Sequence, residues 1–229
     1  MDFGGLPERL AQVRSEIARH QAAGAWTHPV TIVAVTKGFG PEAVAAALAA
    51  GLLDIGENRV QEALAKMPAF AGRGVRWHLI GHLQRNKAKS VPGRFALVHS
   101  VDSAELAREL DQRAAAAGAP QPVLLQVNVA GEEQKSGCDP AAARGLAKEI
   151  GGCEALRLEG LMGMAPFTDD ESVQRRTFRG LRLLRDDLQQ EGLWLPTLSM
   201  GMSGDYGMAA AEGATAIRLG TVLFGPRTA

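Results

Sequence analysis

The sequence has few cysteines, no excess of charge of either sign and no long hydrophobic run. Its 229 residues include only Cys138 and Cys153, too few for a disulfide framework or a cysteine metal cage. The 25 basic and 25 acidic side chains give a formal net charge of zero, whereas nucleic-acid binders usually carry a basic excess. The longest apolar run, from Ala43 to Leu53, is well short of the ~20 residues that span a bilayer. We therefore expect a cytoplasmic protein whose main partner is neither nucleic acid nor a membrane.

The N-terminal segment predicts an amphipathic helix rather than a secretory signal. Leu6, Leu10, Val13 and Ile17 recur at helical spacing, and charged residues between them interrupt any apolar core of a signal peptide. We expect this helix to cover part of the fold that follows.

After this helix, apolar runs typical of strands alternate with helical stretches. The runs are Val30–Thr36, Leu52–Gly56, Trp77–Ile80, Leu97–Val101, Val123–Val129, Leu158–Met164, Thr197–Met202 and Ala216–Phe224. The helical stretches are Pro41–Ala50, Arg59–Lys66, Gln84–Ser90, Ala104–Ala117, Ala141–Ile150, Ser172–Glu191 and Tyr206–Ala211. Near-continuous apolar strands separated by helices predict an α/β fold with a parallel sheet.

Eight such runs fit a (β/α)8 TIM barrel, and an open doubly wound sheet is the alternative. The first strand is followed by Lys37-Gly38-Phe39-Gly40-Pro41, which lacks the G-x-G-x-x-G fingerprint of a doubly wound nucleotide-binding sheet. The sequence therefore predicts one barrel domain over residues 1–229. The loops after its strands are expected to form the functional face.

A lysine stands at the end of the first predicted strand. Lys37 follows the run Thr31-Ile32-Val33-Ala34-Val35-Thr36, so it is expected at the barrel mouth. A low dielectric there disfavours the ammonium form and lowers the pKa of the lysine. A neutral amine is what Schiff-base chemistry with a carbonyl group requires. The alternative is that Lys37 extends into solvent at the strand end.

Two glycine-containing turns near the C-terminus are typical of an anion site. Ser199-Met200-Gly201-Met202-Ser203-Gly204-Asp205 closes one strand and opens a helix, and Ile217-Arg218-Leu219-Gly220-Thr221 follows at the last strand. Small residues leave backbone N–H groups accessible, and barrels frequently hold phosphate with the loops after strands seven and eight. The expected cradle is Ser203, Gly204, Gly220 and Thr221. Alternatively, Ser203 only caps the following helix.

Two further polar residues leave alternatives open. Arg218 lies inside an apolar strand and needs an acceptor, which a ligand, Glu159 or Glu57 would supply. Asn58 is expected to cap the helix that follows it, although its amide can instead face the barrel mouth.

Two common catalytic motifs do not occur. His78 and His82 are four residues apart, but Gly81 interrupts the element and no H-E-x-x-H motif is present, so zinc is not expected. Gly201-Met202-Ser203-Gly204-Asp205 is not the G-x-S-x-G turn of a serine hydrolase.

A lysine after the first strand with a phosphate cradle after the last two predicts a phosphorylated aldehyde held covalently. The chain also resembles the pyridoxal phosphate homeostasis proteins, the YggS/PROSC family, over residues 6–227. The matching segments are Ala34-Val35-Thr36-Lys37, Gly56-Glu57-Asn58-Arg59-Val60-Gln61-Glu62, Trp77-His78-Leu79-Ile80-Gly81-His82-Leu83-Gln84-Arg85-Asn86-Lys87, His99-Ser100-Val101-Asp102-Ser103, Gln126-Val127-Asn128-Val129, Lys135-Ser136-Gly137, Gly160-Leu161-Met162, Leu198-Ser199-Met200-Gly201-Met202-Ser203 and Arg218-Leu219-Gly220-Thr221-Val222-Leu223-Phe224-Gly225. These segments are specific in combination rather than singly.

The resemblance implies that Lys37 binds pyridoxal 5′-phosphate (PLP) as an internal aldimine. It implies phosphate contacts from Ser203, Gly220 and Thr221, and a contact of Arg218 with the pyridine nitrogen. An arginine there disfavours protonation of the ring and weakens the cofactor as an electron sink, which fits a carrier better than a catalyst. The full set of expected cofactor-binding residues is Lys37, Asn58, His82, Met200, Ser203, Gly204, Arg218, Gly220 and Thr221.

The family implies a barrel of the alanine-racemase N-terminal-domain type without that enzyme's additional β domain, plus the N-terminal helix. It implies a non-enzymatic role in intracellular PLP homeostasis or delivery, with PLP-dependent apoenzymes as recipients. The compact chain without a dimerising domain favours a monomer. Two positions depart from the family pattern: Gly38 replaces a hydroxyl residue after Lys37, and Arg59 replaces an aromatic residue after Asn58.

Two enzymes are the alternatives. A PLP-dependent amino-acid racemase or decarboxylase would use a second base, and Tyr206 is the chain's only tyrosine. A Schiff-base aldolase would use Lys37 on a sugar phosphate without any cofactor.

Overall fold

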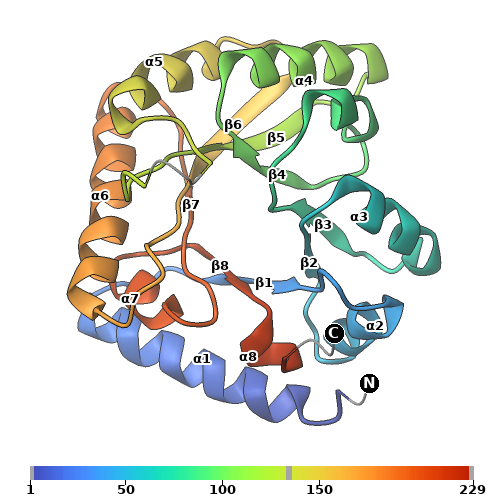
Figure 1. Cartoon of the computed structure of the whole chain (residues 1–229), viewed down its shortest axis with the longest axis vertical. Helices are drawn as coiled ribbons and strands as arrows, with labels where there is room; N and C mark the ends of the chain where they lie inside the picture. The colour runs from blue at the N-terminus through green and yellow to red at the C-terminus, as the bar shows by residue number, and fades with distance from the viewer. Residues whose placement is uncertain (1–2, 133–135, 227–229) are drawn as a thin grey trace.

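The structure, a computed structural model, describes residues 3–132 and 136–226. Eight parallel strands form a closed barrel in which each strand pairs with its neighbours in sequence and β8 pairs with β1 (Figure 1). The strands are β1 (Thr31–Val35), β2 (Asp54–Glu57), β3 (Arg76–Leu79), β4 (Leu97–Val101), β5 (Gln121–Gln126), β6 (Leu156–Met162), β7 (Thr197–Ser199) and β8 (Ala216–Leu219). The predicted (β/α)8 barrel is confirmed, and the doubly wound alternative is wrong.

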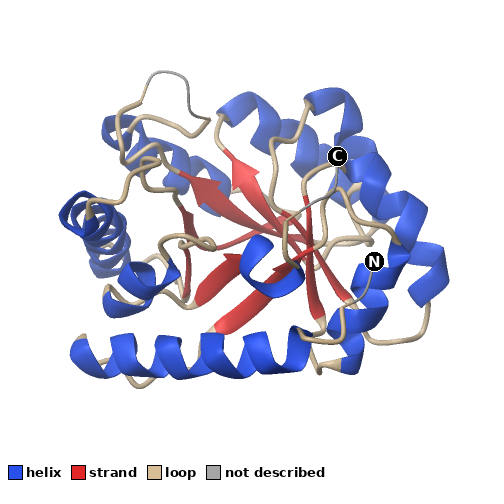
Figure 2. Ribbon diagram, turned by 60° about the horizontal axis from the view of Figure 1, so that its bottom comes forward, coloured by secondary structure: helices blue, strands red, loops and turns tan. Residues whose placement is uncertain are grey.

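Helices follow the strands and cover the outside of the barrel (Figure 2). They are α1 (Leu6–Ala23), α2 (Pro41–Ala49), α3 (Val60–Lys66), α4 (Ala104–Ala117), α5 (Pro140–Gly151), α6 (Glu171–Gln190), α7 (Tyr206–Ala211) and α8 (Thr221–Phe224), with the 3-10 helices η1 (Met67–Phe70) and η2 (Arg85–Ser90). None of the helices among the described residues is long and apolar enough to cross a membrane.

The largest difference from the predicted elements lies at the end of the chain. The run Ala216–Phe224 was expected to be one strand, but β8 ends at Leu219 and α8 begins after Gly220. A short apolar run does not distinguish a strand from a helical turn, because it covers too few residues to show a period. Gly220 is therefore the turn residue between β8 and α8, at the C-terminal end of the last strand.

The barrel interior is polar as well as apolar. Leu97, Leu124 and Met162 form a small apolar cluster separate from the main core. His99 on β4 contacts Ser199 on β7 by a hydrogen bond of 2.8 Å. Because β4 and β7 are not neighbours in the barrel, this bond crosses its interior.

Helix α1 packs along the seam where the barrel closes. Its buried face is Leu6, Leu10, Val13 and Ile17, as predicted, and it packs against α7 and α8. Arg9 Nε donates a hydrogen bond of 2.6 Å to the carbonyl oxygen of Leu223 on α8. Figures 1 and 2 show α1 running along the edge of the barrel beside these C-terminal elements.

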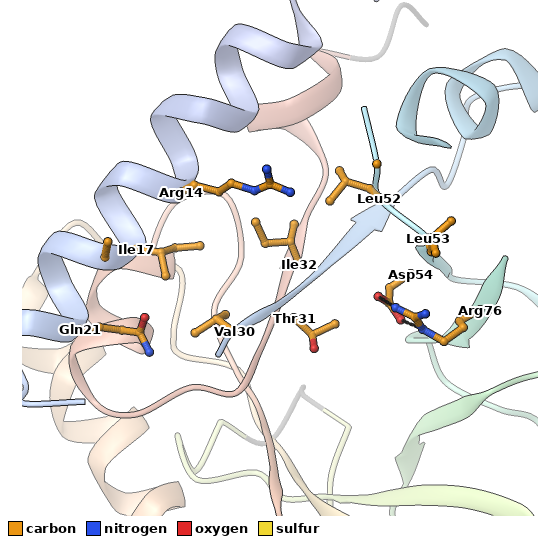
Figure 3. A pocket seen from close by; sticks show the side chains of 12 residues that line it. Arg14, Ile17, Gln21, Val30, Thr31, Ile32, Leu52, Leu53, Asp54 and Arg76 are labelled. Atoms are coloured by element: carbon orange, nitrogen blue, oxygen red, sulfur yellow. Dashed lines mark hydrogen bonds and ion pairs between the residues drawn. The ribbon is translucent and has the colours of Figure 1, made fainter. Parts of the chain in front are cut away.

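A cavity of about 300 Å³ lies between α1 and the N-terminal ends of β1 to β3. Figure 3 shows Arg14 and Gln21 of α1 on one side of it, and Asp54 paired with Arg76 on the other. This cavity lies at the end of the barrel opposite the loops that follow the strands.

Candidate functional site

A second cavity, of about 430 Å³, opens at the C-terminal ends of the strands. The expected binding residues that line it are Lys37, Asn58, Ser203, Gly204, Arg218, Gly220 and Thr221. They come from the ends of β1, β2, β7 and β8, so the closed barrel brings together positions that are far apart in the sequence. Such a face is where barrel proteins build their functional sites.

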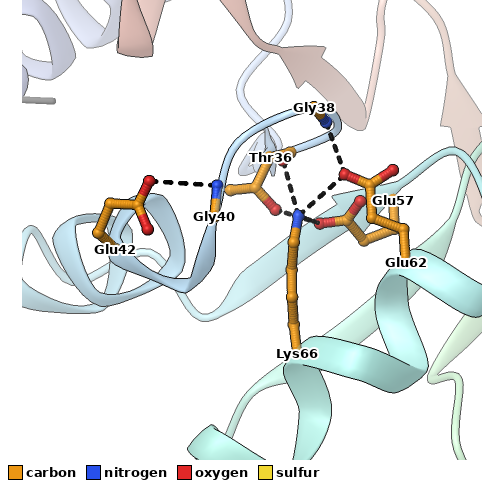
Figure 4. A network of polar contacts seen from close by, with 7 residues as sticks. All are labelled: Thr36, Gly38, Gly40, Glu42, Glu57, Glu62 and Lys66. Atoms are coloured by element: carbon orange, nitrogen blue, oxygen red, sulfur yellow. Dashed lines mark hydrogen bonds and ion pairs between the residues drawn. The ribbon is translucent and has the colours of Figure 1, made fainter.

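The turn that carries Lys37 is held from below by a network of ionic contacts (Figure 4). Lys66 Nζ, on α3, donates hydrogen bonds to Thr36 O at 2.9 Å, to Glu57 Oε1 at 2.7 Å and to Glu62 Oε1 at 3.1 Å. The backbone N–H of Gly38 donates to Glu62 Oε1 at 2.6 Å. Both chain neighbours of Lys37 are therefore fixed, which leaves the half-buried lysine side chain to face the cavity.

Glu57 is the buried anion of this network. Burial raises the pKa of its carboxyl, and the hydrogen bonds from Lys66 and Thr36 act against that rise. The Thr36 hydroxyl donates to Glu57 Oε1 at 2.5 Å, so the hydroxyl before Lys37 has a structural partner. An ionised carboxylate with no exposed surface depends on such partners for its stability.

The alternative that Arg218 forms an ion pair with Glu57 or Glu159 is wrong. Glu57 pairs with Lys66, and Glu159 pairs with Arg157. The alternation of side chains along a strand explains why Arg218 has other partners. Successive side chains point to opposite faces of the sheet, and Arg218 lies on the inner face of the barrel. Its guanidinium donates to side-chain and backbone oxygens inside the barrel instead.

Arg218 is 4% exposed, and its two terminal nitrogens have partners in the barrel interior. NH1 donates to Ser199 Oγ at 2.5 Å, and NH2 donates to the carbonyl oxygen of Gly163 at 3.1 Å. Burial lowers the pKa of Arg218 to about 10, while the negative charge of Asp205 opposes that shift. The cavity therefore has a cationic wall that is largely removed from solvent.

Ser203 does not cap α7, so the capping alternative is wrong. The N-cap residue of α7 is Asp205, and Ser203 Oγ accepts a hydrogen bond of 3.3 Å from the backbone N–H of Val222 on α8. This bond ties the loop after β7 to the turn after β8. Beside it, a Cβ built on Gly204 would meet no atom within 4 Å, which shows open space at this wall of the cavity.

The expectation that Asn58 caps α3 is also wrong. The N-cap residue of α3 is Arg59, and no side chain caps that helix. Asn58 is half-buried and lines the cavity. Gly81 packs against it so closely that a Cβ at position 81 would lie 2.3 Å from the carbonyl oxygen of Asn58.

His82 and Met200 are not among the residues that line this cavity. His82 is exposed beyond the end of β3. Met200 is fully buried in the main core, because the alternation that turns Ser199 inward turns its neighbour outward. Lys135, from one of the matching segments, lies outside the described residues.

The loop after β6 contributes a further wall, from which none of the expected binding residues comes, although Phe167–Glu171 is recognisable in the sequence as a polar loop after a strand. Residues 164–169 line the cavity, together with Val35, Ile80, Gln174, Met202 and Asp205. Phe167 is fully exposed at this rim. The polar character of the loop and its place after a strand are the signals that point to it.

Comparison with known proteins relates the whole chain to one family. Residues 9–228 match the family described as alanine racemase, N-terminal domain. A pyridoxal phosphate homeostasis protein of Pseudomonas aeruginosa is 44% identical over 97% of this chain and 96% of its own, and one of Aquifex aeolicus is 40% identical over 96% and 97%. The solved structure of PipY of Synechococcus elongatus with PLP bound has a TM-score of 0.85 and 38% identity, covering 96% of this chain and all of that one.

Proposed function

The chain belongs to the alanine racemase N-terminal-domain family and, within it, to the pyridoxal phosphate homeostasis proteins, and on that premise we propose that it binds PLP in the cavity of Lys37. We propose that residues 1–229 act as one unit that holds the cofactor for intracellular homeostasis or delivery. The observation that carries the proposal is that Lys37, the Ser203 loop and Arg218 line one cavity. The PLP bound in the PipY structure supports it.

The chemistry of the lining residues fits the three functional groups of PLP. An aldehyde needs an amine, and Lys37 provides one on a turn that Thr36 and Gly38 hold in position. A phosphate needs hydrogen-bond donors, which the hydroxyls of Ser203 and Thr221 and the backbone at two glycines supply. A pyridine nitrogen is an acceptor, and Arg218 is a donor-only side chain at the cavity wall.

Lys37 is the proposed covalent attachment point. Its neutral amine condenses with the aldehyde carbon, the nitrogen takes the place of the carbonyl oxygen, and that oxygen leaves as water. The link is reversible in water, which suits a protein that both takes up and releases PLP. Ser203, Gly204, Gly220 and Thr221 are proposed to hold the phosphate, and Asn58 to line the ring.

Arg218 supports a carrier over a catalyst. A guanidinium at the pyridine nitrogen keeps that nitrogen unprotonated, and PLP then withdraws electrons from a bound amino acid less strongly. Tyr206, the candidate second base for a racemase, does not line the cavity of Lys37. We propose on these grounds a regulator without strong catalytic activity of its own, acting as a monomer that passes PLP to apoenzymes.

The test of binding uses the absorption spectrum of the purified protein given PLP, before and after borohydride. We expect visible absorption, and a reduced adduct on the peptide that contains Lys37. Lys37→Ala should lose both, whereas Lys89→Ala, at an exposed lysine of η2, should retain them. A stable adduct at the same cavity in Lys37→Ala would overturn the assignment, and a wild-type protein that stays colourless would favour the cofactor-free aldolase.

The test of the carrier role is turnover. The PLP-loaded protein should show no sustained racemisation or decarboxylation over a panel of amino acids, and it should transfer PLP to an apoenzyme that gains activity. Sustained racemisation would replace the carrier by an enzyme.

A further inference from the structure

A continuous line of hydrogen bonds runs through the barrel interior away from Arg218. Arg218 NH1 contacts Ser199 Oγ at 2.5 Å, and Ser199 Oγ contacts His99 Nδ1 at 2.8 Å. His99 Nε2 contacts His78 Nδ1 at 2.9 Å, and His78 Nε2 contacts Asp54 Oδ1 at 3.0 Å. The line therefore links β8, β7, β4, β3 and β2.

The two ends of this line fix its direction. Arginine has no acceptor, so Arg218 donates to Ser199, and an ionised Asp54 has no donor, so it accepts from His78. Between them each neutral imidazole has one N–H and one lone pair. With both histidines neutral, one order satisfies every contact: the Ser199 hydroxyl donates to His99 Nδ1, and Nε2–H of each histidine donates onward.

Burial makes this order costly to disturb. His99 and Ser199 have no exposed surface, and His78 is 6% exposed. Water has little access to these groups, so a donor or acceptor that lost its partner would have no water to replace it and would destabilise the fold. Burial also lowers the pKa of His99 well below its ordinary value, and the positive charge of Arg218 acts in the same direction, so the His99 ring is neutral.

The far end of the line is anchored at the opposite face of the barrel. Asp54 accepts two hydrogen bonds from Arg76, at 2.7 and 2.5 Å, and both residues line the cavity beneath α1 (Figure 3). Burial alone would raise the pKa of Asp54, but the hydrogen bonds from His78 and Arg76 outweigh it and hold that pKa at about 2. The anchor is thus a carboxylate at any ordinary pH.

We propose that Ser199, His99 and His78 are positioning residues that, anchored on Asp54, hold the guanidinium of Arg218 in its place at the wall of the cofactor cavity. The inference rests on the proposed function for the identity of the ligand. Ser199 keeps NH1 of Arg218 directed into the barrel and Gly163 keeps NH2 there, so the guanidinium is oriented before any ligand arrives. Preorganisation of this kind lowers the cost of binding.

The first experiment needs no cofactor. In ¹⁵N-histidine-labelled wild-type protein, NMR should show both His78 and His99 as neutral rings protonated at Nε2, with Nδ1 unprotonated. A ring protonated at Nδ1, or a doubly protonated His78, would reverse the order of donors and overturn the proposal. This result does not depend on PLP binding, so it is independent of the proposed function.

The second experiment compares three serine variants loaded with PLP. Ser199→Ala removes the hydroxyl that joins Arg218 to His99, whereas Ser199→Thr retains a hydroxyl. Ser100→Ala is the matched control: Ser100 is the neighbour of His99 on β4, is equally buried, and donates at 2.7 Å to the carbonyl oxygen of Gly81 outside the line. One charged hydrogen bond is worth about 1.5–3 kcal/mol, so we expect a roughly tenfold or greater rise in the Kd for PLP in Ser199→Ala.

The decisive readout is the absorption spectrum of the bound cofactor, which reports the surroundings of its ring. Ser199→Ala should shift the absorption maximum, Ser199→Thr should restore it, and Ser100→Ala should leave it unchanged even where it lowers the Tm. An unchanged spectrum and Kd in Ser199→Ala, or equal changes in Ser199→Ala and Ser100→Ala, would overturn the positioning role. If the wild-type protein itself bound no PLP, the proposed function would fail, and the NMR result alone would decide the donor order.

Discussion

Replacing Lys66 by methionine tests whether the ion pair beneath Lys37 stabilises the fold. The Lys66 side chain is 6% exposed and that of Glu57 is 0% exposed, and they are 2.7 Å apart. Lys66→Met leaves the Glu57 carboxylate buried without its cation, and breaking a buried pair in this way costs about 3–5 kcal/mol. For a domain of this size each kcal/mol lowers the Tm by about 2–4 °C, so we expect a fall of roughly 6–20 °C.

The matched control is Lys148→Met. Lys148 is also a helical lysine in an ion pair, with Glu191 at 3.0 Å, but its side chain is 60% exposed. Exposed pairs contribute about 0–1 kcal/mol, so this variant should unfold at nearly the wild-type urea midpoint. Equal losses in the two variants, or a loss below about 1 kcal/mol in Lys66→Met, would refute the argument from burial.

The same variant has a predicted pH dependence. Burial already raises the pKa of Glu57, and removing Lys66 removes a group that opposes the rise. A carboxyl whose folded pKa lies above its unfolded value takes up a proton more readily in the folded state, so stability is gained as pH falls and lost as pH rises. The loss in unfolding free energy caused by Lys66→Met should therefore shrink as the pH falls. At pH 7, the double variant Lys66→Met/Glu57→Gln should recover part of that loss. Because Lys66 also holds Thr36, PLP loading of Lys66→Met should be weaker than that of Lys148→Met.

Three further outcomes follow from the structure. Asp54 has a pKa of about 2 against an ordinary 3.8, so its ionised form stabilises the folded state at a pH above 3.8. Urea titrations at pH 7 and pH 2 should therefore show the difference in unfolding free energy between wild type and Asp54→Asn narrowing by about 2 kcal/mol at the lower pH. Gly81→Ala should push Asn58 aside, which should lower the free energy of unfolding by about 1–3 kcal/mol and weaken PLP binding. Gly145→Ala in α5, where a Cβ meets no atom within 4 Å, should instead stabilise the fold by up to ~1 kcal/mol. Burial raises the pKa of the Cys138 thiol to about 11, so a thiol reagent at pH 8 should label it only after unfolding; rapid labelling of the native protein would contradict its burial.

Much of the fold was predictable because parallel barrel strands are buried on both faces and appear as short apolar runs. The strand Leu97–Val101 and the helices Ala104–Ala117 and Tyr206–Ala211 have the predicted bounds. The last run was misassigned, since Thr221–Phe224 forms a helical turn and not a strand, with Leu223 and Phe224 buried. Periodicity cannot separate these two cases over four residues.

The site was predictable where one residue stands out against its surroundings. Lys37 and Arg218 are charges beside or within apolar runs, and both line the cavity. The partners of Arg218 were not predictable, because Ser199 and Gly163 become its neighbours only when the barrel closes. The capping role expected for Asn58 was wrong for a related reason, because capping is a local property whereas the contact with Gly81 is tertiary; the resemblance placed Asn58 among the binding residues, and it lines the cavity.

The packing of α1 against α7 and α8 has a consequence for the order in which the protein becomes competent during synthesis. The ribosome releases Lys37 early, but the Ser203 loop and the turn at Gly220 emerge last, together with α7 and α8, against which α1 packs. A nascent chain therefore exposes the apolar face of α1 and the Lys37 side chain without the opposing wall of the cavity. The proposed binding of PLP would thereby depend on completion of the chain, because an incomplete protein would have Lys37 without the loops proposed to hold the phosphate.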